Sequence, residues 1–182
     1  QGLRVFDRSA VATVEHTPLR VNLTTDQGYK VTAHKLVIAC GYESQTYLSQ
    51  PVAKLISTYA LASEPLKLPG EWQQEYLIWE TARPYLYLRS TDDGRVIMGG
   101  EDEDFRDPAR RDRLLDYKTQ RLQQKFSKLF PETRLDVAFA WAGTFGETTD
   151  GLAYIGTVDE RPNTWFALGY GGNGITYSIL AA

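Results

Sequence analysis

The chain has 182 residues, with 20 lysine and arginine side chains against 23 aspartate and glutamate side chains, and a net charge of −3 at pH 7. This balance does not suggest a nucleic-acid or anionic-membrane partner, and no apolar run is long enough to span a bilayer. Two histidines and one cysteine make no metal-ligand cluster, and the single Cys40 excludes a disulfide framework and indicates a reducing, cytoplasmic location.

The first part of the chain predicts β-structure. Residues 3–15 are strand-like, and residues 20–25 alternate at period two before a turn into residues 29–32, which predicts a hairpin. Residues 36–39 form a continuous apolar run, typical of a strand buried on both faces, and Gly41 ends it. The end of such a strand is a place where a ligand can meet a sheet, although a plain strand and turn remains the alternative.

The middle of the chain contains the clearest strand pattern. Residues 83–89 alternate, and a turn joins them to a returning strand at residues 95–100. Alternation puts Tyr85, Tyr87 and Arg89 on one face and two leucines on the other. An aromatic face that carries a cation could line a substrate cavity. It could also be a solvent-facing surface with cross-strand packing, and the residues leave both interpretations open.

A helix is predicted at residues 109–130. Asp107 supplies an N-cap, Pro108 occupies the first helical position, and Pro131 ends the helix. We expect its lysines and arginines to form a solvated face rather than a binding patch. The apolar stripe opposite these charges consists of Leu115, Leu122, Phe126 and Leu129.

Further strands are predicted on both sides of this helix. Residues 56–62 precede it, and a domain boundary is placed near residue 49. Residues 137–142 and 152–156 follow it, with a polar, glycine-rich loop between them at residues 143–151.

The last fourteen residues predict a strand, a glycine turn and a helix. The apolar run 165–168 precedes Gly169, Gly171 and Gly174, and residues 175–182 can form the helix. Glycine lets a backbone approach a ligand closely, and a helix start offers unpaired N–H groups to an anion. The glycines spell GxGxxG, but the NAD-type fingerprint needs a following strand and an acid roughly 20 residues later. Neither follows Gly174 in this sequence, so an NAD-type site is not expected in the chain as given. A turn that only packs a helix on a strand is the alternative.

Four stretches of the chain occur in one order: residues 36–41, 84–100, 141–156 and 169–176. Together they resemble the FAD-dependent D-amino-acid oxidase, glycine oxidase and sarcosine oxidase superfamily. The resemblance implies an α+β fold, α/β in the parent, from which the N-terminal Rossmann motif of the flavin domain is missing.

The resemblance also implies a division of the chain into domains. Residues 1–48 and 161–182 would form a partial FAD-binding domain. Residues 49–160 would form a substrate domain with a mixed, mostly antiparallel sheet and helices on one side.

The resemblance assigns cofactor roles to particular residues. Val11 matches a residue whose backbone contacts adenine, and residues 39–41 match a segment that closes over the ADP moiety. Residues 171–176 match the flavin loop, whose helix start would stabilise the negative charge of reduced flavin. The candidate cofactor residues are Val11, Ala39, Cys40, Gly41, Gly171, Gly172, Asn173, Gly174, Ile175 and Thr176.

The candidate substrate residues are Tyr85, Arg83, Trp141 and Glu147. Amino-acid oxidases of the superfamily often carry an arginine in the loop that matches residues 143–150, where it clamps the substrate carboxylate. This chain has none there, so Arg83 or Arg89 would have to substitute, or Glu147 would hold a cationic amine. That loop also has no cysteine to attach a flavin covalently.

The expected function is therefore part of an FAD-dependent oxidoreductase that oxidises a C–N bond of an amine or amino acid by hydride transfer to flavin N5. Its expected partners are the small-molecule substrate and the missing N-terminal nucleotide-binding half. Because the pyrophosphate cradle is absent, the isolated fragment should bind FAD weakly and be inactive. The alternative is a non-catalytic, β-rich binding domain without flavin.

Overall fold

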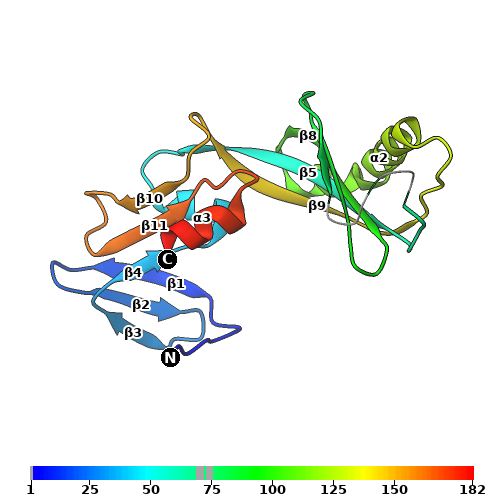
Figure 1. The fold of residues 1–182 in the computed structure, drawn as a ribbon. Helices are drawn as coiled ribbons and strands as arrows, with labels where there is room; N and C mark the ends of the chain where they lie inside the picture. The colour runs from blue at the N-terminus through cyan, green and yellow to red at the C-terminus, as the bar shows by residue number, and fades with distance from the viewer. Residues whose placement is uncertain (1, 69–71, 73–75) are drawn as a thin grey trace. The chain divides into compact units, whose positions relative to one another are not determined.

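The computed structural model describes residues 2–68, 72 and 76–182 of the chain. The chain divides into two compact units: unit 1 comprises residues 1–53 and 148–182, and unit 2 comprises residues 54–147. In chain order the elements are β1 (Val11–His16), β2 (Val21–Thr25), β3 (Lys30–Ala33), β4 (Leu36–Ile38), the 3₁₀ helix η1 (Gly41–Tyr47), β5 (Ala53–Ser63), β6 (Leu77–Trp79), β7 (Leu86–Ser90), β8 (Val96–Asp104), α1 (Pro108–Arg113), α2 (Leu115–Leu129), β9 (Val137–Thr148), β10 (Tyr154–Thr157), β11 (Thr164–Leu168) and α3 (Gly174–Ala181) (Figure 1). The mixture of mostly antiparallel sheets and few helices confirms the predicted α+β class.

An antiparallel sheet of order β1-β2-β3 forms one part of unit 1. The predicted hairpin is confirmed, with Gly28 at φ +84° in the turn between β2 and β3. The strand predicted at residues 3–15 begins only at Val11. No strand is assigned in residues 2–10, and the left-handed φ of Arg8, +49°, bends the chain there.

The second sheet of unit 1 has the order β10-β11-β4, with β11 antiparallel to β10 and parallel to β4. Residues 148–160, which the sequence assigned to the second domain, lie in unit 1 because β10 pairs with β11. The prediction that β4 is buried on both faces is wrong for this chain. Ile38 is buried, but the side chain of Val37 is 63% exposed because no described residue covers that face.

Unit 2 is built on one sheet of order β6-β7-β8-β5-β9. The predicted alternation is confirmed, since Leu86 and Leu88 are buried while Tyr85 and Tyr87 lie on the opposite face. Helix α2 covers the leucine face, with Leu122 and Phe126 packed in the core (Figure 1). The buried members of this core are Tyr59, Leu61, Trp72, Leu86, Leu88, Val96, Met98, Leu122, Phe126 and Leu135.

The predicted helix cap is confirmed, since the Asp107 carboxylate accepts a hydrogen bond of 2.7 Å from the Arg110 amide. The single helix predicted at residues 109–130 is divided into α1 and α2. At Leu114 the amide is shared between the carbonyls of Arg110 and Arg111, both at 3.2 Å, which tightens the turn. The charged residues are not all solvated. Lys118 is only 8% exposed and donates to the Glu101 carbonyl at 2.8 Å.

The polar loop predicted at residues 143–151 is mostly strand, because β9 continues to Thr148 and only residues 149–151 form a turn. Gly143, which suggested a loop, lies within the strand instead. A Cβ at Gly143 would lie 3.6 Å from the Thr58 methyl group of the neighbouring strand β5. Glu147 is therefore held on a strand rather than on a loop.

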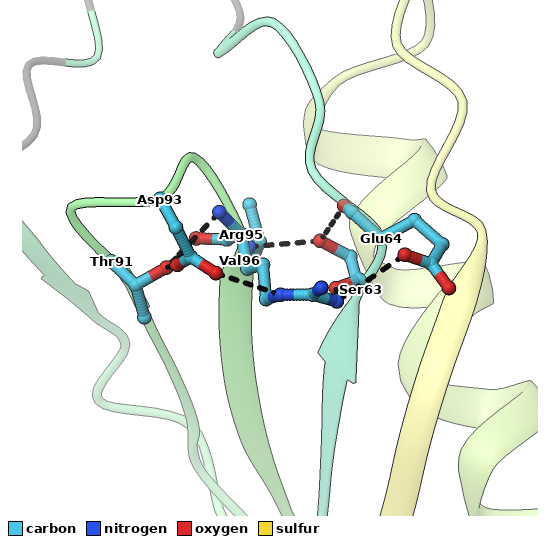
Figure 2. Close-up of polar contacts among 6 residues, drawn as sticks. All are labelled: Ser63, Glu64, Thr91, Asp93, Arg95 and Val96. Carbon is cyan, nitrogen blue, oxygen red and sulfur yellow. Dashed lines mark hydrogen bonds and ion pairs between the residues drawn. The ribbon is translucent and has the colours of Figure 1, made fainter.

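The turn between β7 and β8 is tied to the end of β5 through Arg95 (Figure 2). The Arg95 guanidinium donates to Asp93 within the turn at 2.9 Å and to the Ser63 carbonyl at 2.9 Å. The Ser63 hydroxyl in turn accepts a bond of 2.8 Å from the Val96 amide. These bonds fix the register of β8 against β5 at this end of the sheet.

Candidate functional site

The parallel pair of β4 and β11 brings two of the predicted cofactor segments to one edge of unit 1. Ile38 pairs with Phe166, so both strands end at the same side of the sheet. Residues 39–41 leave that edge from β4, and residues 169–174 leave it from β11. The carboxyl edge of neighbouring parallel strands is the usual place for a ligand in an open α/β sheet.

The glycine loop after β11 ends directly at the start of α3. Gly169 and Gly171 adopt left-handed φ values of +75° and +53°, and the Asn173 amide closes the turn on the Tyr170 carbonyl at 3.0 Å. The Asn173 side chain does not cap the helix, so the first amides of α3 are not occupied by a capping side chain. A Cβ at Gly171 or Gly174 would meet no atom of the chain within 4 Å.

The other segment at this edge is also a tight turn. Gly41 has φ +66° and begins η1, and its Cβ position is open. Behind it, the buried Ser44 hydroxyl accepts a bond of 3.0 Å from the Cys40 amide, which holds the segment on η1. Cys40 itself is an exposed free thiol.

Val11 does not belong to this edge. It is the first residue of β1, in the separate antiparallel sheet of unit 1. The far end of β1 is fixed near the start of β11, where His16 Nδ1 lies 3.1 Å from the Pro162 carbonyl.

An apolar pocket of about 370 Å³ lies elsewhere in unit 1 and includes no predicted site residue. Its lining comprises Leu48, Val52, Ala153, Tyr154, Ile155, Gly156, Thr157, Val158, Phe166 and Leu168.

In unit 2, three aromatic rings line the face of the sheet that α2 does not cover. The Tyr85 ring lies 6.3 Å from that of Trp79 and 6.1 Å from that of Tyr87, centroid to centroid. The Arg83 guanidinium stacks 5.6 Å from the Tyr85 centroid, a cation–π contact. A Cβ at Gly99 would overlap the Tyr87 hydroxyl, so this glycine gives the ring its room.

The other predicted substrate residues share this face through β9. Gly143 faces Thr58, and strand alternation places Trp141 and Glu147 on the same side as Gly143. The charge of Glu147 contributes to raising the pKa of Tyr85, after the larger effects of burial and of Asp102. The structure therefore gathers Arg83, Tyr85, Trp141 and Glu147 on one sheet face.

Sequence reasoning missed Asp102, which lies on the same face. Its charge raises the pKa of both Tyr85 and Tyr87, second only to burial. Burial raises the pKa of the Asp102 carboxyl itself. The signal that could have revealed it is the glycine pair before Glu101, since glycine within a strand often marks a bulge that re-aims a side chain.

In sequence, the whole chain, residues 1–182, matches the family model described as FAD dependent oxidoreductase, DAO. The chain belongs to this family. Membership confirms the predicted resemblance, and the family depends on FAD. No curated protein matches the chain in sequence.

Solved structures share this family fold at low sequence identity. Glycine oxidase from Geobacillus kaustophilus matches with a TM-score of 0.72 and 20% identity, over 97% of this chain and 46% of that one. L-proline dehydrogenase from P. horikoshii matches with a TM-score of 0.79 and 18% identity, over 97% of this chain and 48% of that one. L-amino acid deaminase from Proteus vulgaris matches with a TM-score of 0.71 and 18% identity, over 99% of this chain and 45% of that one. The chain thus spans about half the length of these proteins.

No described helix is long and apolar enough to cross a bilayer. The described histidine, cysteine, aspartate and glutamate side chains include no group of three or more placed to hold a metal ion.

Proposed function

We propose that the chain is part of an FAD-dependent oxidoreductase that oxidises a C–N bond of an amine or amino acid. The observation that carries this proposal is the parallel pairing of β4 with β11. It brings residues 39–41 and the loop 171–176 to one carboxyl edge, where Gly41, Gly171 and Gly174 leave open space beside the backbone. Similarity to an amino-acid oxidase fold alone would not assign such a role, because one fold supports many functions.

The residues at this edge suit a flavin. The start of α3 carries the positive end of a helix dipole and amides that no side chain caps. Bound FAD would accept the hydride from the carbon next to the substrate nitrogen. The amides of α3 and the Thr176 hydroxyl would hold negative charge at the adjoining polar edge of the cofactor. Gly171 and Gly174 would let the backbone come close, and any side chain there would occupy the ligand's space.

The two units would divide this work. Unit 1 would hold the flavin, with residues 39–41 closing over the ADP moiety and the backbone of Val11 contacting adenine. Unit 2 would bind the substrate on the sheet face that carries Tyr85 and Glu147. The aromatic side chains there would exclude water from the reacting bond.

A nucleotide-binding half would pack against unit 1. Helix α3 exposes Ile175, Ile179 and Leu180, and β4 exposes Val37. Parallel strands are almost always covered on both faces and paired on both sides, whereas β4 pairs only with β11 among the described strands. A parallel strand beside β4 and a helix over Val37 would bury this surface.

A flavin-free binding domain is the second candidate. The exposed apolar surface of unit 1 would then contact another protein. The open glycine loop argues against it, since glycines with open Cβ positions before a helix start that no side chain caps suit a bound ligand.

Replacing Gly174 by aspartate in the complete protein tests the proposal. The position has no positive φ and no atom within 4 Å of an added Cβ, and an acid at a helix start favours the helix. The variant should therefore fold and melt like the wild type, yet lose the bound FAD, because a side chain and a negative charge enter the flavin loop.

The matched control is Ser127→Asp, which adds the same charge to an exposed position of helix α2 in unit 2. FAD content by absorbance after gel filtration and melting by circular dichroism would be measured for both variants. Undiminished FAD in Gly174→Asp, or FAD absent from the wild type, would count against the proposed function.

A further inference from the structure

A carboxylate oxygen lies unpartnered under the aromatic face of unit 2. Oδ1 of Asp102 is buried and has no hydrogen-bond partner among the described residues. Leaving such an oxygen unsatisfied costs free energy, so a donor from a ligand or from an ordered water is expected there. The established family membership assigns this residue no role.

A β-bulge places Asp102 on this face. The pairing of β5 with β8 shifts between Tyr59, opposite Gly100, and Ser57, opposite Glu103. Glu101 occupies the bulged position of β8 and adopts a left-handed φ of +56°. As a result Glu101 and Glu103 both meet α2, through Arg121 and Lys118, while Asp102 emerges on the opposite side.

The two glycines before the bulge make room for this arrangement. A Cβ at Gly99 would overlap the Tyr87 hydroxyl, and a Cβ at Gly100 would overlap the Tyr85 carbonyl. Without them, neither tyrosine could lie across the strand close to Asp102. The left-handed backbone at Glu101 and the two glycines are features that often occur at functional sites, and here they position the Asp102 side chain.

The groups that act on Asp102 come from every element around it. Burial and the charge of Glu147, on β9, raise the pKa of the Asp102 carboxyl. A hydrogen bond from Thr58, on β5, and the charges of Lys118, on α2, and Arg83 lower it by less, so the net shift is upward. Lys118 is already paired with Glu103 at 3.0 Å on the helix side, so it does not neutralise Asp102.

We propose that Asp102, with Glu147 beside it, binds the positively charged nitrogen of a primary or secondary amine substrate and takes up its proton. This deepens the proposed function and rests on it. An N–H bond of the substrate breaks, its electron pair stays on nitrogen, and the proton forms an O–H bond on Asp102. The neutral amine that results is the form from which the adjoining carbon can give up hydride.

The aromatic rings favour the same ligand. The rings of Trp79, Tyr85 and Tyr87 cluster on this face, and the Tyr85 ring already holds one cation, the Arg83 guanidinium. A carboxylate ligand would instead meet Asp102 and Glu147, two charges of its own sign, against the single Arg83 guanidinium. Recognition of the amine therefore does not need the arginine clamp that residues 143–150 lack.

The test uses three probes that share a tert-butyl group in the complete protein: tert-butylamine, tert-butanol and pivalate. None carries a hydrogen on the carbon next to its polar group, so the amine cannot be oxidised during titration. Calorimetric titration of the wild type, Asp102→Asn, Glu147→Gln and the exposed turn control Asp92→Asn would give their affinities. FAD content would be recorded for each protein.

Tert-butylamine should bind the wild type and Asp92→Asn at least about 10-fold more tightly than tert-butanol. Asp102→Asn should lose about 10- to 100-fold for the amine and keep its affinity for the alcohol, which is the size of a charge-assisted hydrogen bond. Lowering the pH should weaken amine binding to the wild type through an ionisation that Asp102→Asn lacks. Should Asp102→Asn fail to fold, Asp102→Ser replaces it.

Unchanged amine affinity in the Asp102 variant, or tighter binding of pivalate than of the amine, would overturn the inference. The FAD readout separates it from the proposed function. Amine binding that depends on Asp102 in a protein without FAD would keep this site and reject the oxidoreductase. If FAD is retained and amine binding does not depend on Asp102, the oxidoreductase proposal is kept and the Asp102 site is rejected.

Discussion

Replacing Glu101 by glutamine tests how much the ion pairs between β8 and α2 stabilise unit 2. The Glu101 side chain is 5% exposed, and its two oxygens lie 3.0 Å from Arg121 Nε and 2.9 Å from Lys125 Nζ. Burial raises the pKa of this carboxyl, but the hydrogen bonds from Lys125 and Arg121 outweigh burial and hold the pKa below 4.5. The variant keeps the shape of the side chain, removes its charge and replaces one acceptor oxygen by a donor NH2 group.

The expected loss follows from how far each partner is buried. Removing one member of a fully buried ion pair costs about 3–5 kcal/mol. Arg121 and Lys125 are partly exposed, so water solvates them after the substitution. We expect the free energy of unfolding at pH 7 to fall by about 1–3 kcal/mol, or about 2–4 °C in Tm for each kcal/mol.

The pH dependence gives the sharper test. Because the pKa of Glu101 is lower in the folded state than in the unfolded state, its stabilisation is complete above pH 4.5 and is lost as the pH falls through the folded-state pKa. Urea denaturation at pH 7 and near pH 3 should therefore show the gap between wild type and Glu101→Gln closing on acidification. The exposed Glu132→Gln is the control. A gap as large near pH 3 as at pH 7 would refute the reasoning.

Three further substitutions probe the fold around the site. Phe126→Ala empties a fully buried position of the unit 2 core and should cost about 3–5 kcal/mol in urea denaturation, and an effect under about 1 kcal/mol would contradict its place in the core. Asp107→Ala removes the N-cap of α1 and should lower the free energy of unfolding by about 1 kcal/mol, whereas Asp107→Asn should keep most of the stability of the wild type. Gly100→Ala should cost at least about 2 kcal/mol, because its Cβ meets the Tyr85 backbone at φ +142°, and wild-type melting would disprove the bulge geometry.

Local patterns predicted the parts of the fold that depend on neighbours in sequence. The β2–β3 hairpin, the alternation around Leu86 and the Asp107 cap each follow from a few adjacent residues. The glycine turn followed by a helix at the end of the chain was predicted for the same reason. Within a few residues, turn chemistry and periodicity leave little choice of structure.

Features set by distant partners were not predictable in this way. Gly143 looked like a loop residue because its neighbour Thr58 lies 85 positions earlier in the chain. Lys118 looked solvated because the Glu101 carbonyl and Glu103 that hold it come from another element. The joining of residues 39–41 with the glycine loop likewise depends on a parallel pairing between strands far apart in sequence.

The bulge in β8 accounts for the most specific part of the site. Glu101 and Asp102 are neighbours of the same charge. Strand alternation alone places them on opposite faces but does not determine which of the two faces α2. The pairing shift fixes the choice, so Glu101 is neutralised by Arg121 and Lys125 and serves stability. Asp102 is left with an unpartnered oxygen among aromatic rings. One local distortion thus separates a structural acid from an acid available to a ligand, which is why stability should depend on the first and amine binding on the second.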